Sequence, residues 1–309
     1  NAGAYVGDGW WCSAINDPTS YTLNVATQCV TGRLYGTPGG ITAMKHYQGN
    51  IIAFKRRAMH LGVYQGPPLV WSWSTISRNI GCFTHECVVE ADNILYWWDH
   101  NGCWMFDGSR PTRVPNAPVS WMKENAHPQG SSAWKGMYDP VDRLIRWYFH
   151  GGSGAGALPS TNRSISYHPE SGRWGRNDHQ AIAVLQVSQY RANRNGEIRG
   201  GVIQGANVKI YNGTANTASF TTGFYGDPEK LTMLRAARLR YVDAPDSAQV
   251  THYYRNNTGT DLETGETRPE VGGKFDLSHE ARWHRFVFTT TGTTEVRGLS
   301  VEVAEGGSR

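Results

Sequence analysis

The fold is decided by a short stretch, ADNILYWW at residues 91–98, in which a turn leads directly into five apolar residues. Asp and Asn favour turns because their side chains hydrogen-bond to nearby backbone groups. The apolar run has no polar position on either face, whereas a strand with one face in water alternates polar and apolar residues. We therefore predict a strand that is buried on both faces, which requires a covering layer on each side.

The same pattern recurs along the chain: a turn, an apolar strand, and a second strand that ends in an aromatic residue. After residues 91–98 this second strand is WMFDG at residues 104–108. The copies are 43, 49 and 53 residues apart when measured between their turn residues, Asn50, Asn93, Asp142 and Asn195. That spacing is close to the about 40–50 residues of a four-stranded propeller blade. Blades packed face against face supply the two-sided burial that the first stretch requires.

The composition agrees with an all-β chain. There are 36 glycines among 309 residues, and aromatic residues make up 12%. Helices tolerate glycine poorly, whereas aromatic side chains fit a pleated, half-buried surface. We predict an all-β fold with a β-propeller-like domain of four-stranded blades over residues 1–227. The alternative is a β-sandwich whose hairpins resemble one another.

The texture of the sequence changes around Asp227-Pro228. Residues 228–309 are predicted to be either one or more closing blades or a small appended β-domain, and the residues leave both interpretations open. Within the third copy, the low-complexity stretch GGSGAGALPS at residues 151–160 predicts a loop inserted between two strands.

Charge and hydropathy exclude two classes of protein. Thirty Lys and Arg oppose 26 Asp and Glu, for a net charge of +4, and the basic residues are dispersed. A dedicated nucleic-acid binder usually shows a stronger, clustered excess. The longest apolar run has five residues, ILYWW, whereas an α-helix needs about 20 to cross a membrane. We therefore predict no membrane segment.

Two small basic clusters stand out within this dispersed background. The tighter is Lys55, Arg56 and Arg57, and the next is Arg235, Arg238 and Arg240. Both clusters are candidates for a surface that faces passing DNA or contacts another subunit, and the plainer interpretation is a solvated rim.

The residues that can carry catalysis or bind metal do not form a recognisable motif. The five cysteines contain no CxxC pair, which predicts reduced structural thiols and no zinc site. Neither His85-Glu86 nor His279-Glu280 has the second histidine of a zinc-protease motif four residues after the first. The nearest cluster of carboxylates in sequence comprises Glu86, Glu90, Asp92 and Asp99. Such residues are equally expected at turns, so we predict no enzyme activity, no cofactor and no metal.

Several short motifs follow one another in a distinctive order. They are WWCSAINDPTSY at 10–21, GITA at 40–43, FKR at 54–56, YQGPP at 64–68, ISRNIGC at 76–82 and FDGS at 106–109. In this order the chain resembles a family of tailed-bacteriophage virion proteins that are built around β-propellers and act as tail hubs or nozzles. Beyond these segments the similarity is one of texture.

The resemblance implies a position in a particle rather than a chemistry. It implies a structural subunit of the virion tail that forms a cyclic homo-oligomer, with a hexamer favoured, around the genome-ejection channel. Its partners would be other tail or adaptor proteins of the virion, together with double-stranded DNA in transient passage. It also implies assembly in the cytoplasm of the bacterial host, which agrees with unpaired thiols.

Two other functions remain as alternatives. The first is a propeller that binds or hydrolyses glycans at the host surface, because exposed tryptophans can form platforms for sugar rings. The tryptophans concerned are Trp71, Trp73, Trp97, Trp98 and Trp104, most of which we predict to be core residues. The second is a head-completion or adaptor protein, which differs from a tail hub only in its place along the particle.

Overall fold

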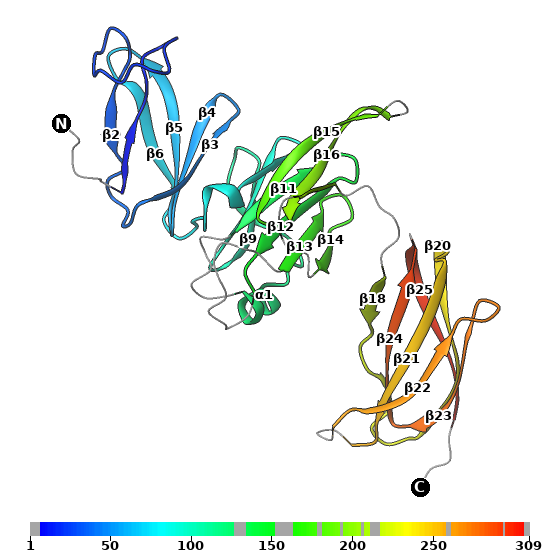
Figure 1. The fold of residues 1–309 in the computed structure, drawn as a ribbon. Helices are drawn as coiled ribbons and strands as arrows, with labels where there is room; N and C mark the ends of the chain where they lie inside the picture. Colours follow the sequence, from blue (N-terminus) through cyan, green and yellow to red (C-terminus); the bar gives the residue numbers. More distant parts are fainter. Residues whose placement is uncertain are drawn as a thin grey trace. The chain divides into compact units, whose positions relative to one another are not determined.

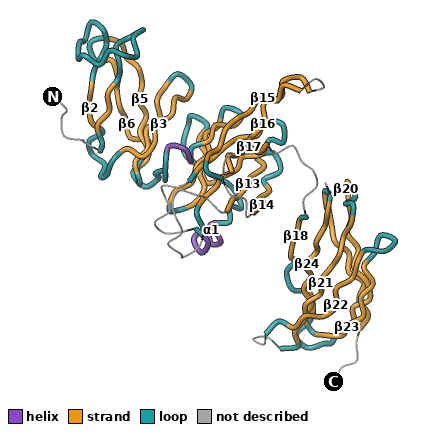
Figure 2. The backbone as a smooth tube through the Cα atoms, viewed as in Figure 1, coloured by secondary structure: helices purple, strands orange, loops and turns teal. Residues whose placement is uncertain are grey.

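The structure is a computed structural model, and it describes residues 7–126, 134–151, 163–177, 181–191, 194–204, 207–210, 217–257, 261–292 and 294–305. Strands dominate these residues, which confirms the all-β prediction (Figure 2). The described helices are α1 (Val119–Asn125) and the single 3₁₀ turn η1 (His85–Cys87). The loop predicted at residues 151–160 lies, after Gly151, outside the described residues. The chain divides into two compact units, residues 1–211 and 212–309.

The N-terminal unit contains four successive antiparallel sheets, in each of which the strands follow one another along the chain (Figure 1). The first sheet contains β3 (Ile41–Tyr47), β4 (Asn50–Lys55), β5 (Met59–Gly66) and β6 (Val70–Ser77). The second contains β7 (Val89–Ala91), β8 (Ile94–Asp99), β9 (Gly102–Phe106) and β10 (Thr112–Arg113). The third contains β11 (Lys135–Asp139), β12 (Leu144–Phe149), β13 (Arg163–His168) and β14 (Arg173–Asn177). The fourth contains β15 (Ala183–Arg191), β16 (Arg194–Gln204) and β17 (Asn207–Ile210).

The recurring sequence pattern corresponds to the second and third strands of each sheet. In the first three copies its turn joins the first strand to the second, whereas the turn predicted at residues 194–197 in the fourth copy is part of strand β16. The first strands begin at residues 41, 89, 135 and 183, so the sheets repeat every 46 to 48 residues. The turn before β8 has two residues, Asp92 and Asn93, with φ of 49° and 61°. Positive φ at both central positions belongs to the tight hairpin turn that Asn and Asp tolerate best.

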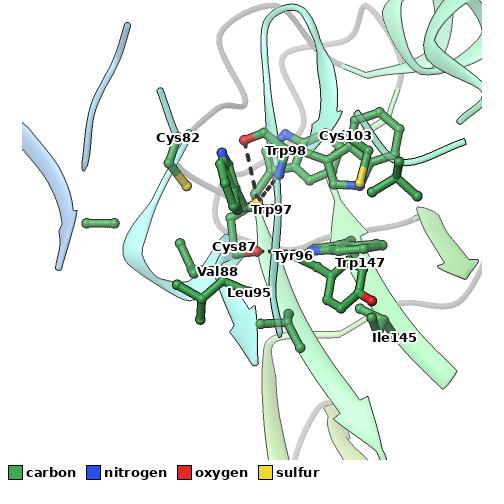
Figure 3. Close-up of a cluster of buried hydrophobic side chains, with 14 of the residues drawn as sticks. Cys82, Cys87, Val88, Leu95, Tyr96, Trp97, Trp98, Cys103, Ile145 and Trp147 are labelled. Atoms are coloured by element: carbon green, nitrogen blue, oxygen red, sulfur yellow. Dashed lines mark hydrogen bonds between the residues drawn. The ribbon is translucent and has the colours of Figure 1, made fainter. Parts of the chain in front are cut away.

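The sheets of the N-terminal unit pack face against face. Trp97 of β8 packs on Phe54 of the first sheet, with ring centroids 5.0 Å apart. The indole Nε1–H of Trp147 in the third sheet donates to the carbonyl of Cys87, 3.0 Å away, beside the second sheet. Figure 3 shows Trp97, Cys87 and Trp147 in this cluster of buried side chains. Every residue of β8 after Ile94 is buried, which confirms the predicted two-sided burial of this strand.

The fourth sheet packs on the third through a smaller cluster. Met137 and Tyr148 of the third sheet contact Val202 of β16 there. The backbone N–H of Gly200 also donates to the buried carboxylate of Asp139, 3.2 Å away. A side chain at Gly200 would meet Met137 at 2.7 Å, so glycine allows the close approach of the two sheets.

The segment before the first sheet covers that sheet on the face opposite the second sheet. It includes a two-stranded ribbon of β1 (Gly9–Trp11) and β2 (Thr31–Arg33). Trp10 packs against Trp73 of β6 with centroids 5.5 Å apart. The contacts of the N-terminal unit therefore run in series from this segment through the four sheets. The described residues show no closed propeller, so the finer part of the fold prediction is not established.

The C-terminal unit is a sandwich of two antiparallel sheets. The larger sheet contains β18 (Ala218–Thr221), β24 (Trp283–Thr291), β21 (Ser247–Arg255) and β22 (Glu263–Pro269), with β19 (Tyr225–Gly226) also paired to β24. The smaller sheet contains β23 (Phe275–Ala281), β20 (Thr232–Asp243) and β25 (Glu295–Glu305). The core between them includes Leu234, Val250, Phe275, Phe286 and Phe288. Because β18 and β19 pair with β24, the unit begins before the boundary expected at residues 227 and 228.

All five cysteines are free thiols, and four of them are buried. Burial raises the pKa of the Cys82 and Cys103 thiols. Thiols with a raised pKa are poor nucleophiles, because the thiolate is the reactive form. These cysteines act as small apolar core residues.

Candidate functional site

The first basic cluster, at the turn between β4 and β5, is divided by burial. Arg56 and Arg57 are exposed, whereas Lys55 is fully buried and its ammonium donates to the carbonyls of Leu34 and Thr37, each 2.7 Å away. Burial lowers the pKa of Lys55. The alternation of β4 places this side chain beneath the N-terminal segment. The prediction that Lys55 faces DNA or another subunit is therefore corrected, because its charge is used inside the fold.

Lys55 should attach the N-terminal segment to the first sheet. Lys55→Met keeps the apolar stem but leaves two buried carbonyls without their donor, which should cost about 2 kcal/mol of stability. Hydrogen exchange at residues 31–37 measures the loosening. The exposed neighbour gives a matched control, Arg57→Met, and equal protection of these residues in both variants would contradict the role of Lys55.

The second basic cluster lies on β20 in the C-terminal unit. Arg235, Arg238 and Arg240 are all exposed, and Arg238 forms an ion pair with Glu302 of β25 at 3.1 Å. The two basic clusters belong to different units.

The carboxylates that the sequence groups together serve different parts of the fold. Asp99 is buried and accepts hydrogen bonds from the backbone N–H groups of Asn101 and Gly102 and from the indole of Trp104, at 2.7 to 3.0 Å. Asp92 accepts from the Tyr138 hydroxyl, Glu86 pairs with Lys135, and Glu90 is exposed on β7. Within the described ranges, no group of three or more His, Cys, Asp or Glu residues is arranged to hold a metal ion.

The tryptophans proposed as sugar platforms belong mainly to the packed interior. Trp97 and Trp98 are fully buried, which confirms the core interpretation for these two. The remaining three, Trp71, Trp73 and Trp104, are half-buried.

The best candidate for a functional surface is instead the N-terminal segment. Its exposed apolar side chains, which we call the N-terminal apolar surface, are Trp11, Ile15, Tyr21, Leu23, Val25 and Tyr35, between 49% and 72% exposed. The backbone beneath them is held in place, since Asn24 and Cys29 exchange two N–H···O bonds of 3.0 and 3.1 Å. Terminal elements of stacked arrays normally present a polar outer face. These exposed apolar side chains make the segment a candidate interaction surface.

Sequence reasoning missed this surface although the sequence contains a sign of it. Residues 21–25, YTLNV, alternate apolar and polar side chains as a half-buried strand does. In the structure these residues belong to no strand, and all five are exposed. The alternation is therefore not that of a half-buried strand, and only the exposure seen in the structure reveals the surface.

A second apolar face lies at the other end of the series, on the fourth sheet. Val184 and Val202 are register partners that face the third sheet. Leu185, Ile203 and Val208 lie on the opposite face, which we call the outer face of the fourth sheet, and Val208 is 55% exposed. Among the described strands outside the fourth sheet, it is a strand of the third sheet, β11, that contacts the fourth sheet extensively.

Comparison with known proteins does not assign the chain to a family. No protein-family model matches it, and no curated protein is significantly similar to it. In the part of the chain that the structure describes, no helix is both long enough and apolar enough to span a membrane.

Proposed function

We propose that this chain is a structural subunit of a tailed-phage virion, a tail hub or nozzle protein that assembles with copies of itself into a ring around the genome-ejection channel. The proposed assembly rests on one observation. The two ends of the series of sheets carry different apolar faces, the N-terminal apolar surface and the outer face of the fourth sheet. The place in a phage tail is supported by the ordered motifs between residues 10 and 109.

Two unlike faces favour a head-to-tail contact. The N-terminal apolar surface of one copy covers the outer face of the fourth sheet in the next, so each copy uses both faces once. Such heterologous contacts form a closed ring when the rotation between copies closes. A hexamer is the stoichiometry that the resemblance favours, and other tail or adaptor proteins would contact the ring.

The proposed role needs no cofactor and no catalytic group. A net charge of only +4 over 309 residues suits a wall past which double-stranded DNA moves. Strong neutralisation of phosphates would instead hold the DNA by releasing its counterions.

Charge placed on either face should abolish the ring. Leu23→Asp removes one face and Val208→Asp the other, and each variant alone should be monomeric by mass photometry, because a buried, unpaired carboxylate opposes the contact. A 1:1 mixture of the two variants should give heterodimers and nothing larger, since each retains one intact face. Val271→Asp, at a residue 64% exposed in the C-terminal unit, is the matched control and should leave the ring intact.

A monomeric wild-type chain would contradict the proposed assembly, and so would a ring that forms from the Leu23→Asp variant. Cryo-EM of purified virions tests the location with the same protein. Density for this chain in a ring on the tail axis is expected. Its presence only at the head would favour a head-completion or adaptor protein.

A further inference from the structure

The larger sheet of the C-terminal unit carries two arginines side by side on its outer face. In β21 and β24, His252, His284 and Phe286 are buried in the sandwich, so the alternate residues point away from the core. Tyr253 is the register partner of Arg285, and Arg255 is the register partner of Trp283. Arg255 and Arg285 are therefore diagonal neighbours on one face, within reach of each other's side chains.

Both guanidinium groups contact the same aromatic ring. The Cζ atom of Arg255 lies 4.2 Å from the ring centroid of Phe224, and that of Arg285 lies 5.6 Å from it. Phe224 precedes β19, which pairs with β24, so the ring is held beside this face. Cation–π contacts with one ring hold the two guanidinium groups together on this face.

Neither arginine has a carboxylate partner among the described residues. Elsewhere in the same unit Arg238 and Arg268 pair with Glu302 and Glu266. Arg255 is half-buried, and its Nε atom is buried without a hydrogen-bond partner. An unsatisfied buried donor costs stability, and two cations on neighbouring strands repel each other. An anion bound between the terminal nitrogens of the two groups would remove the repulsion.

The loop beside this pair carries a third arginine. Arg282 is half-buried and directly precedes Trp283, the register partner of Arg255. Its backbone is held on both sides, because its N–H donates to the Asn256 side chain at 3.2 Å and its carbonyl accepts from the N–H of Asp227 at 3.1 Å. The backbone beside the arginine pair is thus held in place.

We propose that Arg255 and Arg285, held by Phe224, form a phosphate-binding site. Guanidinium groups match the tetrahedral oxygens of phosphate through paired N–H donors, and two neighbouring positive charges favour an anion between them. The phosphate can belong to a nucleic-acid strand or be free. Phe224, which is 38% exposed, supplies aromatic surface beside the two arginines on which a base of a strand can stack. This site is independent of the proposed ring.

Binding of two probes to the full chain at constant ionic strength tests the site. The probes are inorganic phosphate, followed by calorimetry, and a short single-stranded oligothymidylate, followed by fluorescence anisotropy. Arg255→Gln and Arg285→Gln should each weaken binding about tenfold or more. Arg235→Gln is the matched control, because Arg235 is an exposed arginine of the same unit, and it should bind as the wild type does.

Each outcome decides the proposal or the source of the phosphate. Binding of both probes that is lost in both variants supports a site for nucleic-acid phosphates, and binding of inorganic phosphate alone supports a site for free phosphate. The conservative variant Arg285→Lys keeps the charge but not the paired donors, so it should also weaken binding. Because this variant keeps the charge, weaker binding by it cannot be ascribed to misfolding of the Gln variants. No binding of either probe by the wild type, or equal binding by the Gln variants and Arg235→Gln, overturns the proposal.

Discussion

Replacing Trp97 with alanine should lower the free energy of unfolding of the N-terminal unit by about 3–5 kcal/mol. The side chain is fully buried and packs on Phe54 of the first sheet. Its Nε1–H also donates to the carbonyl of Gly81 at 2.8 Å. Alanine would leave a cavity between two sheets and a buried carbonyl without its donor, so a transfer penalty and a hydrogen-bond penalty add.

The measurement is equilibrium urea unfolding of the full chain, followed by fluorescence. Trp97→Phe separates the two penalties, because it fills most of the cavity but cannot donate to Gly81, and it should cost clearly less than Trp97→Ala. Leu69→Ala is the control for loss of a large apolar side chain from the surface of the same unit, since Leu69 is 60% exposed. A Trp97→Ala variant as stable as Leu69→Ala would show that the face-to-face packing of the first two sheets does not stabilise the unit.

The sequence predicts the local parts of the N-terminal unit well because their causes are local. The turn at Asp92-Asn93 follows from residues that tolerate positive φ, and the buried strand after it follows from an uninterrupted apolar run. Both features need only a few neighbouring residues. The intervals between the predicted turn residues are unequal because the turns differ in length. Two residues join β7 to β8, and four join β11 to β12.

The errors come from contacts between distant parts of the chain. Lys55 belongs to a basic triplet, but its partners are carbonyls of residues 34 and 37, which the triplet does not reveal. The texture of the sequence changes around Asp227-Pro228, yet β18 before this pair is bonded to β24, more than sixty residues later. Pairings of this kind depend on the whole fold.

The candidate sites were missed for the same reason. Arg255 and Arg285 lie 30 residues apart in sequence and meet only because β21 and β24 pair in one register. The apolar residues at 21–25 show their alternation in the sequence, but their exposure depends on the absence of a covering layer among the described residues. A single sequence shows which residues can share a face and not which face remains exposed.

Two buried histidines in the C-terminal sandwich allow a prediction about acid. His284 Nε2 lies 3.2 Å from the carbonyl of Thr232, which can only accept, so this nitrogen carries the proton. His284 Nδ1 is then the acceptor for the Nε2–H of His252, 2.9 Å away. This leaves His252 Nδ1 unprotonated, buried and without a partner. It lies against Gly265, where even a Cβ atom would approach it to 2.6 Å.

Adding a proton to this nitrogen would place a cation in the core. Burial, followed by the nearby His284 and His279, lowers the pKa of His252 to about 4, although Glu266 opposes the shift. Burial also lowers the pKa of His284. The unfolded chain binds protons near the ordinary histidine value of about 6.5. Between these two values the unfolded state holds more protons, so the stability of the C-terminal unit falls as the pH falls from about 6.5 to about 4.

The C-terminal unit should therefore lose about 2–3 kcal/mol of stability over this interval through His252 alone. Hydrogen exchange of peptides from β21 and β24, corrected for the intrinsic effect of pH and referred to peptides from β8, measures the loss. His252→Gln can still donate to His284 Nδ1 but cannot take up a proton, so it should flatten the pH dependence by about one proton. His46→Gln replaces an exposed histidine and should leave the slope unchanged. Equal slopes for His252→Gln and His46→Gln would show that His252 is protonated without penalty, which its buried, unpartnered Nδ1 does not allow.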